Sequence, residues 1–453
     1  MRKHICLILL VVMSAFVTSS ARPAPAAARA EDTGEHLPAL QADAVANLPP
    51  AASGLAVPAD PVHTGGIGAS PRAAAPAGPA LDAAAASSAL CRLGVGVVRR
   101  NINDYALNVP AALQGLRAGW YETWNTNSNP AQPNGMEMVQ TINLHQWKWE
   151  NNQFVLYSAT APYAVPYSYA LGLSVQNLVA TVTAAPGSLW LVGNEIERRD
   201  WLSSSGVSSG QNEILPELYA QAYHDLYQVI KAADPTARVA NGSVIAPSPL
   251  RLQYLSRVWD EYQRRYGAAM PVDVWNIHVY MGPEVRGGWG IDIPAGIDDV
   301  TAGMWVYAGD PNQGDKQVLV NKDFSQVPPL IVAFRTWMRD HGQQNKPLMV
   351  TEFGVNMPDW IWPGQFTPER VRDEYMIPGL NYLQTATDPG LGYPADENRL
   401  VQGVNWYSLD GDDGAWTAND PNYPGQLVFH QYFNGNLIGS GPLPKTVIWL
   451  PNI

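Results

Sequence analysis

The sequence predicts a closed (β/α)8 barrel of the TIM type, preceded by a signal peptide and a disordered Ala/Pro-rich linker. Eight short apolar runs of strand character follow one another from residue 93 onward, and amphipathic stretches lie between several of them. Such alternation is typical of a parallel sheet. Eight units over roughly 250–350 residues suit a closed barrel. The alternative, an open doubly wound sheet, would want a Gly-rich phosphate turn after the first strand, and the sequence has none.

The N-terminus has the pattern of a secretory signal. Arg2 and Lys3 precede a short apolar run, Ile5–Val17, and small residues follow at Ser19–Ala21. This order is typical of a cleaved signal peptide, and the run is too short for a comfortable membrane span. We expect residues 1–21 to be the signal and the mature protein to be secreted, without a membrane span. A retained signal would instead tether the protein to the cell surface.

After the signal we expect a linker and then one catalytic domain. Residues 22–90 are rich in Ala and Pro and poor in aromatic residues, as in the run "SPRAAAPAGPALDAAAASS". Such a segment has too little apolar bulk to offset the entropy of ordering, so we expect a disordered linker. Near residue 93 the composition changes, and short apolar runs begin to alternate with amphipathic stretches. We expect residues 91–453 to form the barrel domain.

The predicted strands are short, apolar and rich in β-branched and aromatic residues, which fits strands that are buried on both faces. In order they are Leu93–Arg99, Leu116–Trp124, Met136–Leu144, Leu189–Glu195, Arg238–Ile245, Val272–Tyr280, Pro347–Phe353 and Val401–Leu409.

Helical spacing is clearest at Leu215–Ala233, which ends in an Ala-Asp-Pro sequence before the next strand. Tyr169–Ala184, Leu250–Tyr266 and Pro329–His341 are also predicted helices. Two insertions interrupt the alternation: one between the third and fourth strands, containing "HQWKWENNQF", and one over Gly282–Val327. Long loops in barrels are often functional, and both are expected at the carboxyl end of the strands.

Composition excludes several function classes. The formal charge is −12 and no basic patch stands out, so a nucleic-acid partner is not expected. The eight His show no metal-ligand spacing such as HExxH, and no GxSxG motif appears, so neither a metal nor another cofactor is expected. The 16 Trp and 20 Tyr suit surfaces that are both apolar and wettable, such as carbohydrate-binding clefts.

Two carboxylates stand at the ends of predicted strands. Glu195 closes "LWLVGNE" and Glu352 closes "PLMVTE", each after a nearly unbroken apolar run. An unpaired buried charge is costly, so such a placement needs a reason. Cleavage of a glycosidic bond gives one, because it uses two carboxyl groups on either side of the bond. Either residue could instead belong to a structural ion pair at the barrel top.

The ordered motifs resemble clan A of the glycoside hydrolases, the barrel enzymes with catalytic Glu on strands four and seven. The resemblance covers about half the chain, while strands one to three match by order only. "GWYETW" at 119–124 resembles the plant and fungal cell-wall glucanase group of this clan. The motifs are "WLVGNE" at 190–195, "YQVIKAADPTARVANGS" at 227–243, "VWNIHVY" at 274–280, "KPLMVTEFG" at 346–354 and "VNWYSLDG" at 404–411.

The resemblance implies a role for each catalytic carboxylate. Glu195 would be the general acid/base, with a raised pKa in the resting state. Glu352 would be the ionised nucleophile and would form a glycosyl-enzyme intermediate. Because the clan retains anomeric configuration, the two carboxyls should lie about 5–5.5 Å apart.

The resemblance also implies four substrate-binding or tuning residues. Asn194 would bind the hydroxyl beside the reacting carbon, and Tyr280 would donate to Glu352. His278 would bind sugar or tune a carboxylate, and Trp406 would be the platform under the sugar. Each could equally have a structural role, such as filling the barrel.

Three further side chains near strand ends are candidate substrate contacts: Arg99, Glu122 and Trp124. We expect a carbohydrate partner, a β-linked polysaccharide or oligosaccharide, and leave the sugar, the linkage and the oligomeric state open. Two other readings remain: a non-catalytic glycan-binding protein on the same barrel, and a secreted adhesive protein with the Ala/Pro segment as its stalk.

Overall fold

The computed structural model describes residues 92–97, 118–132, 135–156, 158, 160–199, 211–355, 357 and 361–408. The expected signal peptide, the expected linker, Arg99 and the chain after residue 408 lie outside these ranges. In the described part of the chain, no helix is both long and apolar enough to cross a membrane.

Eight parallel strands form the barrel, in chain order around the ring. Strand β12 pairs with β1, and β9 meets β10 through a bridge between Ala240 and Val274, so the ring is nearly closed. All eight strands fall inside the predicted runs, and the predicted fold class is confirmed. The strands are β1 (Leu93–Gly96), β2 (Trp120–Glu122), β3 (Glu137–Ile142), β8 (Leu189–Val192), β9 (Arg238–Asn241), β10 (Trp275–Val279), β11 (Leu348–Phe353) and β12 (Gly403–Trp406).

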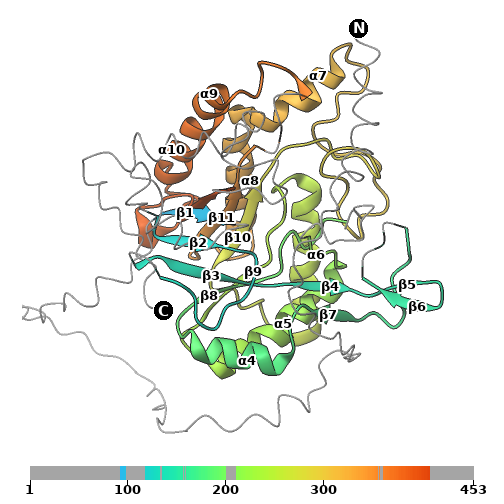
Figure 1. Ribbon diagram of the computed structural model, residues 1–453, viewed down its shortest axis with the longest axis vertical. Coiled ribbons are helices and arrows are strands. Elements are labelled where there is room, and N and C mark those ends of the chain that lie inside the picture. Colours follow the sequence, from blue (N-terminus) through green and yellow to red (C-terminus); the bar gives the residue numbers. More distant parts are fainter. Residues whose placement is uncertain are drawn as a thin grey trace, which may run out of the picture.

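Helices α4 (Val175–Ala184), α5 (Pro216–Ala233), α6 (Pro249–Tyr266) and α8 (Val327–Asp340) connect successive strands and cover the outside of the ring (Figure 1). Helices α5, α6 and α8 lie where helical spacing predicts them. Between β11 and β12 the chain forms α9 (Pro368–Val371), the π-helical turn η6 (Arg372–Met376), α10 (Ile377–Thr385) and the 3-10 turn η7 (Pro394–Asp396).

The prediction of a helix over Tyr169–Ala184 is wrong at its start. Tyr169–Leu171 forms strand β7, which pairs with β4 (Leu144–Gln146) in an antiparallel sheet. The helix begins only at Val175, where the Ser174 hydroxyl caps the Asn177 N–H at 3.2 Å. A partner strand more than 20 residues away in the chain leaves no local pattern in the sequence.

The insertion after β3 is folded rather than irregular. Strands β5 (Lys148–Glu150) and β6 (Gln153–Val155) form a hairpin beyond the β4–β7 pair. Figure 1 shows this hairpin projecting sideways, away from the barrel. The second insertion, after β10, contains α7 (Gln313–Leu319) and the 3-10 turns η3 (Val320–Lys322) and η4 (Phe324–Gln326).

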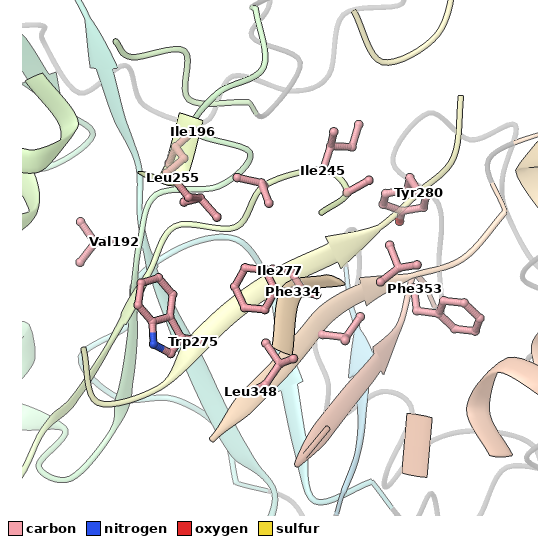
Figure 2. Packing of buried hydrophobic residues seen from close by; sticks show 14 of the residues in the cluster. Val192, Ile196, Ile245, Leu255, Trp275, Ile277, Tyr280, Phe334, Leu348 and Phe353 are labelled. Atoms are coloured by element: carbon pink, nitrogen blue, oxygen red, sulfur yellow. The ribbon is translucent and has the colours of Figure 1, made fainter. Parts of the chain in front are cut away.

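The barrel interior is filled by side chains, foremost by Trp120. A Cβ placed on Gly94 would lie 2.3 Å from the Trp120 ring, so Gly94 leaves the space that the indole occupies. Trp120 is therefore a buried core residue. Outside the ring, Trp275, Phe334 and Leu348 belong to one apolar cluster between the strands and the helices (Figure 2). This packing fixes the strand ends, where the polar side chains gather.

Candidate active site

Glu195 and Glu352 meet at the carboxyl end of the barrel. Glu195 follows β8 by three residues, and Glu352 is the fifth residue of β11. With His278 of β10 they form a group in which one oxygen or nitrogen atom from each residue lies within 4.8 Å of the others. The two carboxylates keep only 4% and 6% of their surface exposed. Charge interactions between them are therefore weakly screened by water.

The turn that carries Glu195 adopts an unusual backbone. Glu195 itself has a φ of 46°, in the left-handed region that side chains disfavour. Its N–H donates to the Ser243 hydroxyl at 3.1 Å. Gly193 has a φ of 102°, and a Cβ there would lie 2.5 Å from Ile196. The end of β9 and a glycine thus hold Glu195 in a conformation that aims it across the barrel mouth.

Two donors hold Glu352. The Tyr280 hydroxyl donates to Oε2 at 3.0 Å, which is the contact that the resemblance implies. The Trp124 Nε1–H donates to Oε1 at 2.7 Å. Trp124 also has a left-handed φ, of 54°, so a second side chain of the site has a strained backbone. Both donors stabilise the ionised form of Glu352.

The His278 imidazole lies between the two carboxylates. Its Nδ1 is 3.3 Å from Glu195 Oε1, and its Nε2 is 3.5 Å from Glu352 Oε1. Burial opposes the charged imidazole, but Glu352 and Glu195 outweigh it and raise the pKa of His278. A single ring can therefore exchange a proton with either carboxylate.

Arg198 is a site residue that the sequence analysis missed. Its Nη1 lies 3.0 Å from Glu195 Oε2, and its side chain is 23% exposed. The sequence "EIERR" gives no sign of this contact, because an i to i+3 pair forms here only through the turn that Glu195 makes. The ion pair places a cation beside one carboxylate of the pair and not beside the other.

The two carboxylates have opposite pKa shifts. Burial alone would raise the pKa of Glu195, but Arg198 and His278 together lower it to about 2. Burial raises the pKa of Glu352 to about 7, with the neighbouring Glu195 charge adding to the effect. The resemblance predicts a raised pKa for Glu195 and an ionised Glu352, whereas the contacts of the resting structure favour the opposite order. Arg198 is the main reason.

A third carboxyl, that of Glu122, lies in the barrel wall near the pair. It is fully buried, and Oε1 accepts a hydrogen bond from the Thr141 hydroxyl at 2.8 Å. Among the described residues its Oε2 has no hydrogen-bond partner. Burial, together with the charge of Glu352, raises the pKa of Glu122 to about 8. Glu122 is thus protonated at neutral pH.

The remaining predicted residues lie in different places. Asn194 precedes Glu195, and its main-chain N–H donates to Asn212 Oδ1 at 2.8 Å. Trp406 is wrong as a platform, because its side chain is fully buried and packs on Phe353. The next residue, Tyr407, is half-buried instead.

Strand alternation explains the difference between Trp406 and Tyr407, because successive side chains point to opposite faces. The Tyr407 ring packs at 5.1 Å against that of Trp124, the residue that donates to Glu352. Tyr407 therefore lies beside the carboxylate pair, next to Trp124 and Tyr280.

The donor set argues for hydrogen-bonded carboxylates over a metal centre. The spacing of Glu195, His278 and Glu352 would admit a divalent ion. However, Tyr280 and Trp124 donate to both oxygens of Glu352, and the Arg198 cation contacts Glu195. These contacts engage both carboxylates through hydrogen bonds and an ion pair within the protein.

Fold and site together define a (β/α)8 barrel with a buried, closely spaced carboxylate pair at the strand ends. No family model matches the chain, and no curated protein matches it in sequence.

Some solved structures are similar to the chain. A family 128 (subgroup II) endo-β-1,3-glucanase from Sorangium cellulosum has a TM-score of 0.40 at 15% identity, over 75% of this chain and 97% of that one. A subgroup II enzyme from Pseudomonas viridiflava has a TM-score of 0.39 at 13% identity, over 76% and 96%. A subgroup I enzyme from Amycolatopsis mediterranei, in complex with laminarihexaose, has a TM-score of 0.38 at 16% identity, over 75% and 98%. Likeness of this degree assigns no activity to the chain.

Proposed function

We propose that this chain is a secreted retaining glycoside hydrolase that cleaves a β-linked polysaccharide or oligosaccharide. The observation that carries the proposal is the spacing of the pair, with one oxygen of Glu195 and one of Glu352 within 4.8 Å. In retaining enzymes the two carboxyls lie about 5–5.5 Å apart, whereas inverting enzymes need about 6.5–9.5 Å to admit a water. The short spacing supports attack by a carboxylate rather than by water.

In the proposed mechanism Glu352 is the nucleophile and Glu195 the acid/base. The Glu352 carboxylate attacks the anomeric carbon while Glu195 gives its proton to the leaving oxygen, and the glycosidic C–O bond breaks. Water then attacks the glycosyl-enzyme, and Glu195 takes back the proton as the sugar leaves. Tyr280 and Trp124 support this assignment, because both donate to Glu352, whereas Arg198 and His278 contact the Glu195 carboxylate.

The resting proton distribution has to change before the first step. Glu352 has the higher pKa in the resting structure, yet it must be ionised to attack. His278 contacts both carboxylates and offers a path for the proton from Glu352 to Glu195. Displacement of the partly exposed Arg198 by substrate would raise the pKa of Glu195 and favour the transfer.

The test of activity is reducing-sugar release from a panel of neutral polysaccharides: laminarin, mixed-linkage β-glucan, xylan and mannan. The chain is compared with Glu352→Gln and with Glu369→Gln, a matched change at an exposed glutamate in α9. We expect release by the parent and by Glu369→Gln, and none by Glu352→Gln. Binding without release by the parent would instead support a non-catalytic glycan-binding protein.

Azide rescue tests the two roles. With an activated aryl glycoside, azide should restore turnover of Glu195→Ala with a glycosyl azide of retained configuration, because the nucleophile still acts. With Glu352→Ala the azide takes the place of the nucleophile, and the product should have inverted configuration. The opposite pair of products would mean that the roles are exchanged, as the resting pKa order alone suggests.

A further inference from the structure

The insertion after β3 carries most of the exposed large apolar side chains of the described residues. We define residues 147–167, from the β5–β6 hairpin to Tyr167, as the aromatic arm. Of the five large apolar side chains that are exposed in the described residues, four lie in the arm: Trp149 at 41%, Phe154 at 39%, Val165 at 83% and Tyr167 at 52%. Exposed aromatic side chains gathered in one segment indicate a binding surface.

The aromatic rings lie on one face of the hairpin. Trp149 and Phe154 are cross-strand partners in the β5–β6 register, and their ring centroids are 4.9 Å apart. Trp147, two residues before Trp149, contacts the same Phe154 ring at 5.9 Å. Because side chains alternate along a strand, Lys148 points to the opposite face.

The opposite face fixes the arm to the barrel. The Lys148 ammonium is buried and lies 2.6 Å from Glu213 Oε2, in the segment before α5. The Tyr163 hydroxyl donates to the other oxygen of Glu213, also at 2.6 Å. A buried, fully engaged ion pair at its base holds the arm in one direction, so the aromatic face is preorganised for a ligand.

The tip of the hairpin carries amides. Asn151 and Asn152 have φ values of 51° and 60°, which form a tight two-residue hairpin turn. Together with Gln153 they are exposed, so three amide side chains lie at the tip of the hairpin, next in the chain to the aromatic pair. Aromatic faces stack on the C–H faces of sugars, and amides exchange hydrogen bonds with hydroxyls. No exposed cation lies among residues 147–155, so the surface suits a neutral ligand.

The base of the arm is continuous with the carboxylate site. Asn143, between β3 and β4, donates to the main-chain oxygen of Trp124 at 2.9 Å, and Trp124 holds Glu352. The side-chain amide of Asn212 in turn lies 3.3 Å from Asn143 Oδ1, and Asn212 accepts from the N–H of Asn194. These hydrogen bonds link the segment from which the arm projects to the carboxylate site.

We infer that the aromatic arm is a second carbohydrate-binding site, which holds a neutral polysaccharide chain outside the catalytic pair through Trp149 and Phe154. The choice of ligand rests on the proposed function. The arm would keep the enzyme on a polymer between cleavage events, as linked binding sites raise effective concentration.

Affinity electrophoresis tests this inference without turnover. Native gels contain laminarin, mixed-linkage β-glucan or glucomannan, with alginate as an acidic polymer, and every variant carries Glu352→Gln. We expect retardation by a neutral polymer, and about tenfold weaker retardation after Trp149→Ala with Phe154→Ala, a loss on the order of two stacked aromatic faces. Val332→Ala, at an exposed apolar residue of α8, is the matched control and should leave retardation unchanged.

Each other outcome has a defined meaning. Trp149→Phe keeps an aromatic ring, so this variant should keep most of the retardation. An unchanged melting temperature of the double alanine variant excludes unfolding as the cause of its weaker retardation. Unchanged retardation of the double alanine variant, retardation by alginate alone, or no retardation by any neutral polymer would overturn the inference. A loss of self-association in the double variant, without loss of polymer binding, would show instead that the arm contacts a second copy of the chain. Turnover assays test the proposed function separately, because every variant in the electrophoresis carries Glu352→Gln.

Discussion

Arg198 forms an ion pair with Glu195, with 3.0 Å between Nη1 and Oε2, while Glu352 receives only neutral donors apart from the His278 imidazole. This asymmetry sets the proton distribution in the resting site. It also separates the two carboxylates chemically, although both lie at the carboxyl end of one barrel. Substrate has to displace Arg198 from Glu195, or the reaction has to proceed with this cation in place.

Removal of this cation should therefore raise the pKa of Glu195. We expect Arg198→Gln to move the acid limb of the pH profile of kcat/KM to higher pH, because that limb follows the group of lower pKa, which is Glu195 in the resting structure. The control is Arg372→Gln, at an arginine of η6 that pairs with Asp373 away from the site. An acid limb that stays in place in Arg198→Gln would show that this cation does not set the pKa of Glu195.

Tyr280→Phe should destabilise the ionised form of Glu352, because the hydroxyl that donates to its carboxylate is lost. Loss of a donor to a charged group costs about 1.5–3 kcal/mol, which corresponds to a fall of about 10- to 100-fold in kcat/KM. Since the hydroxyl lowers the pKa of Glu352, the group of higher pKa in the pair, the alkaline limb should also move to higher pH. Tyr382→Phe, in α10, is the matched control. A fall in rate without movement of the alkaline limb would contradict an electrostatic role for the hydroxyl.

Glu122 should make the fold less stable in alkali. Its pKa is raised from 4.5 to about 8 in the folded state, so between these pH values the folded chain binds a proton that the unfolded chain does not. The free energy of unfolding then falls as pH rises through this window. In urea unfolding at pH 5 and pH 8, Glu122→Gln should reduce the difference between the two values, and Glu369→Gln should not. An unchanged difference would mean that Glu122 is ionised in the fold.

Gly193→Ala should destabilise the fold and reduce activity. Gly193 has a φ of 102°, and a Cβ would lie 2.5 Å from Ile196. Gly309 has a φ of 83° but nothing within 4 Å of a Cβ, so Gly309→Ala reports the backbone cost alone. We expect Gly193→Ala to cost about 1–3 kcal/mol more in thermal or urea unfolding. Equal costs would mean that Ile196 can move aside.

Much of the barrel could be predicted from the sequence, because strands buried on both faces are continuous apolar runs. Glu195 and Glu352 stand out against such runs for the same reason: a carboxylate after "LWLVGN" or "PLMVT" breaks the pattern. Their proximity follows only from the closed ring of strands, which brings residues distant in the sequence together. Strand β7 was not predictable, because its only partner, β4, is distant in the chain.

The electrostatics of the site could not be predicted from the sequence. The Arg198–Glu195 pair depends on the left-handed backbone of Glu195, and the contact of Trp124 with Glu352 joins β2 to β11 across the barrel. Whether Trp406 or Tyr407 faces the site depends on the register of β12, since alternate residues point in opposite directions. These features arise from tertiary structure, whereas the strand pattern is local.

The most direct measurement of the central claim is the configuration of the first product, followed by proton NMR in the first minutes of hydrolysis of whichever polysaccharide in the panel is cleaved. With Glu195 and Glu352 acting by double displacement, the β-anomer should appear first and then mutarotate, and Glu352→Gln should give no signal. The α-anomer appearing first, or equal turnover by Glu352→Gln, would contradict the account.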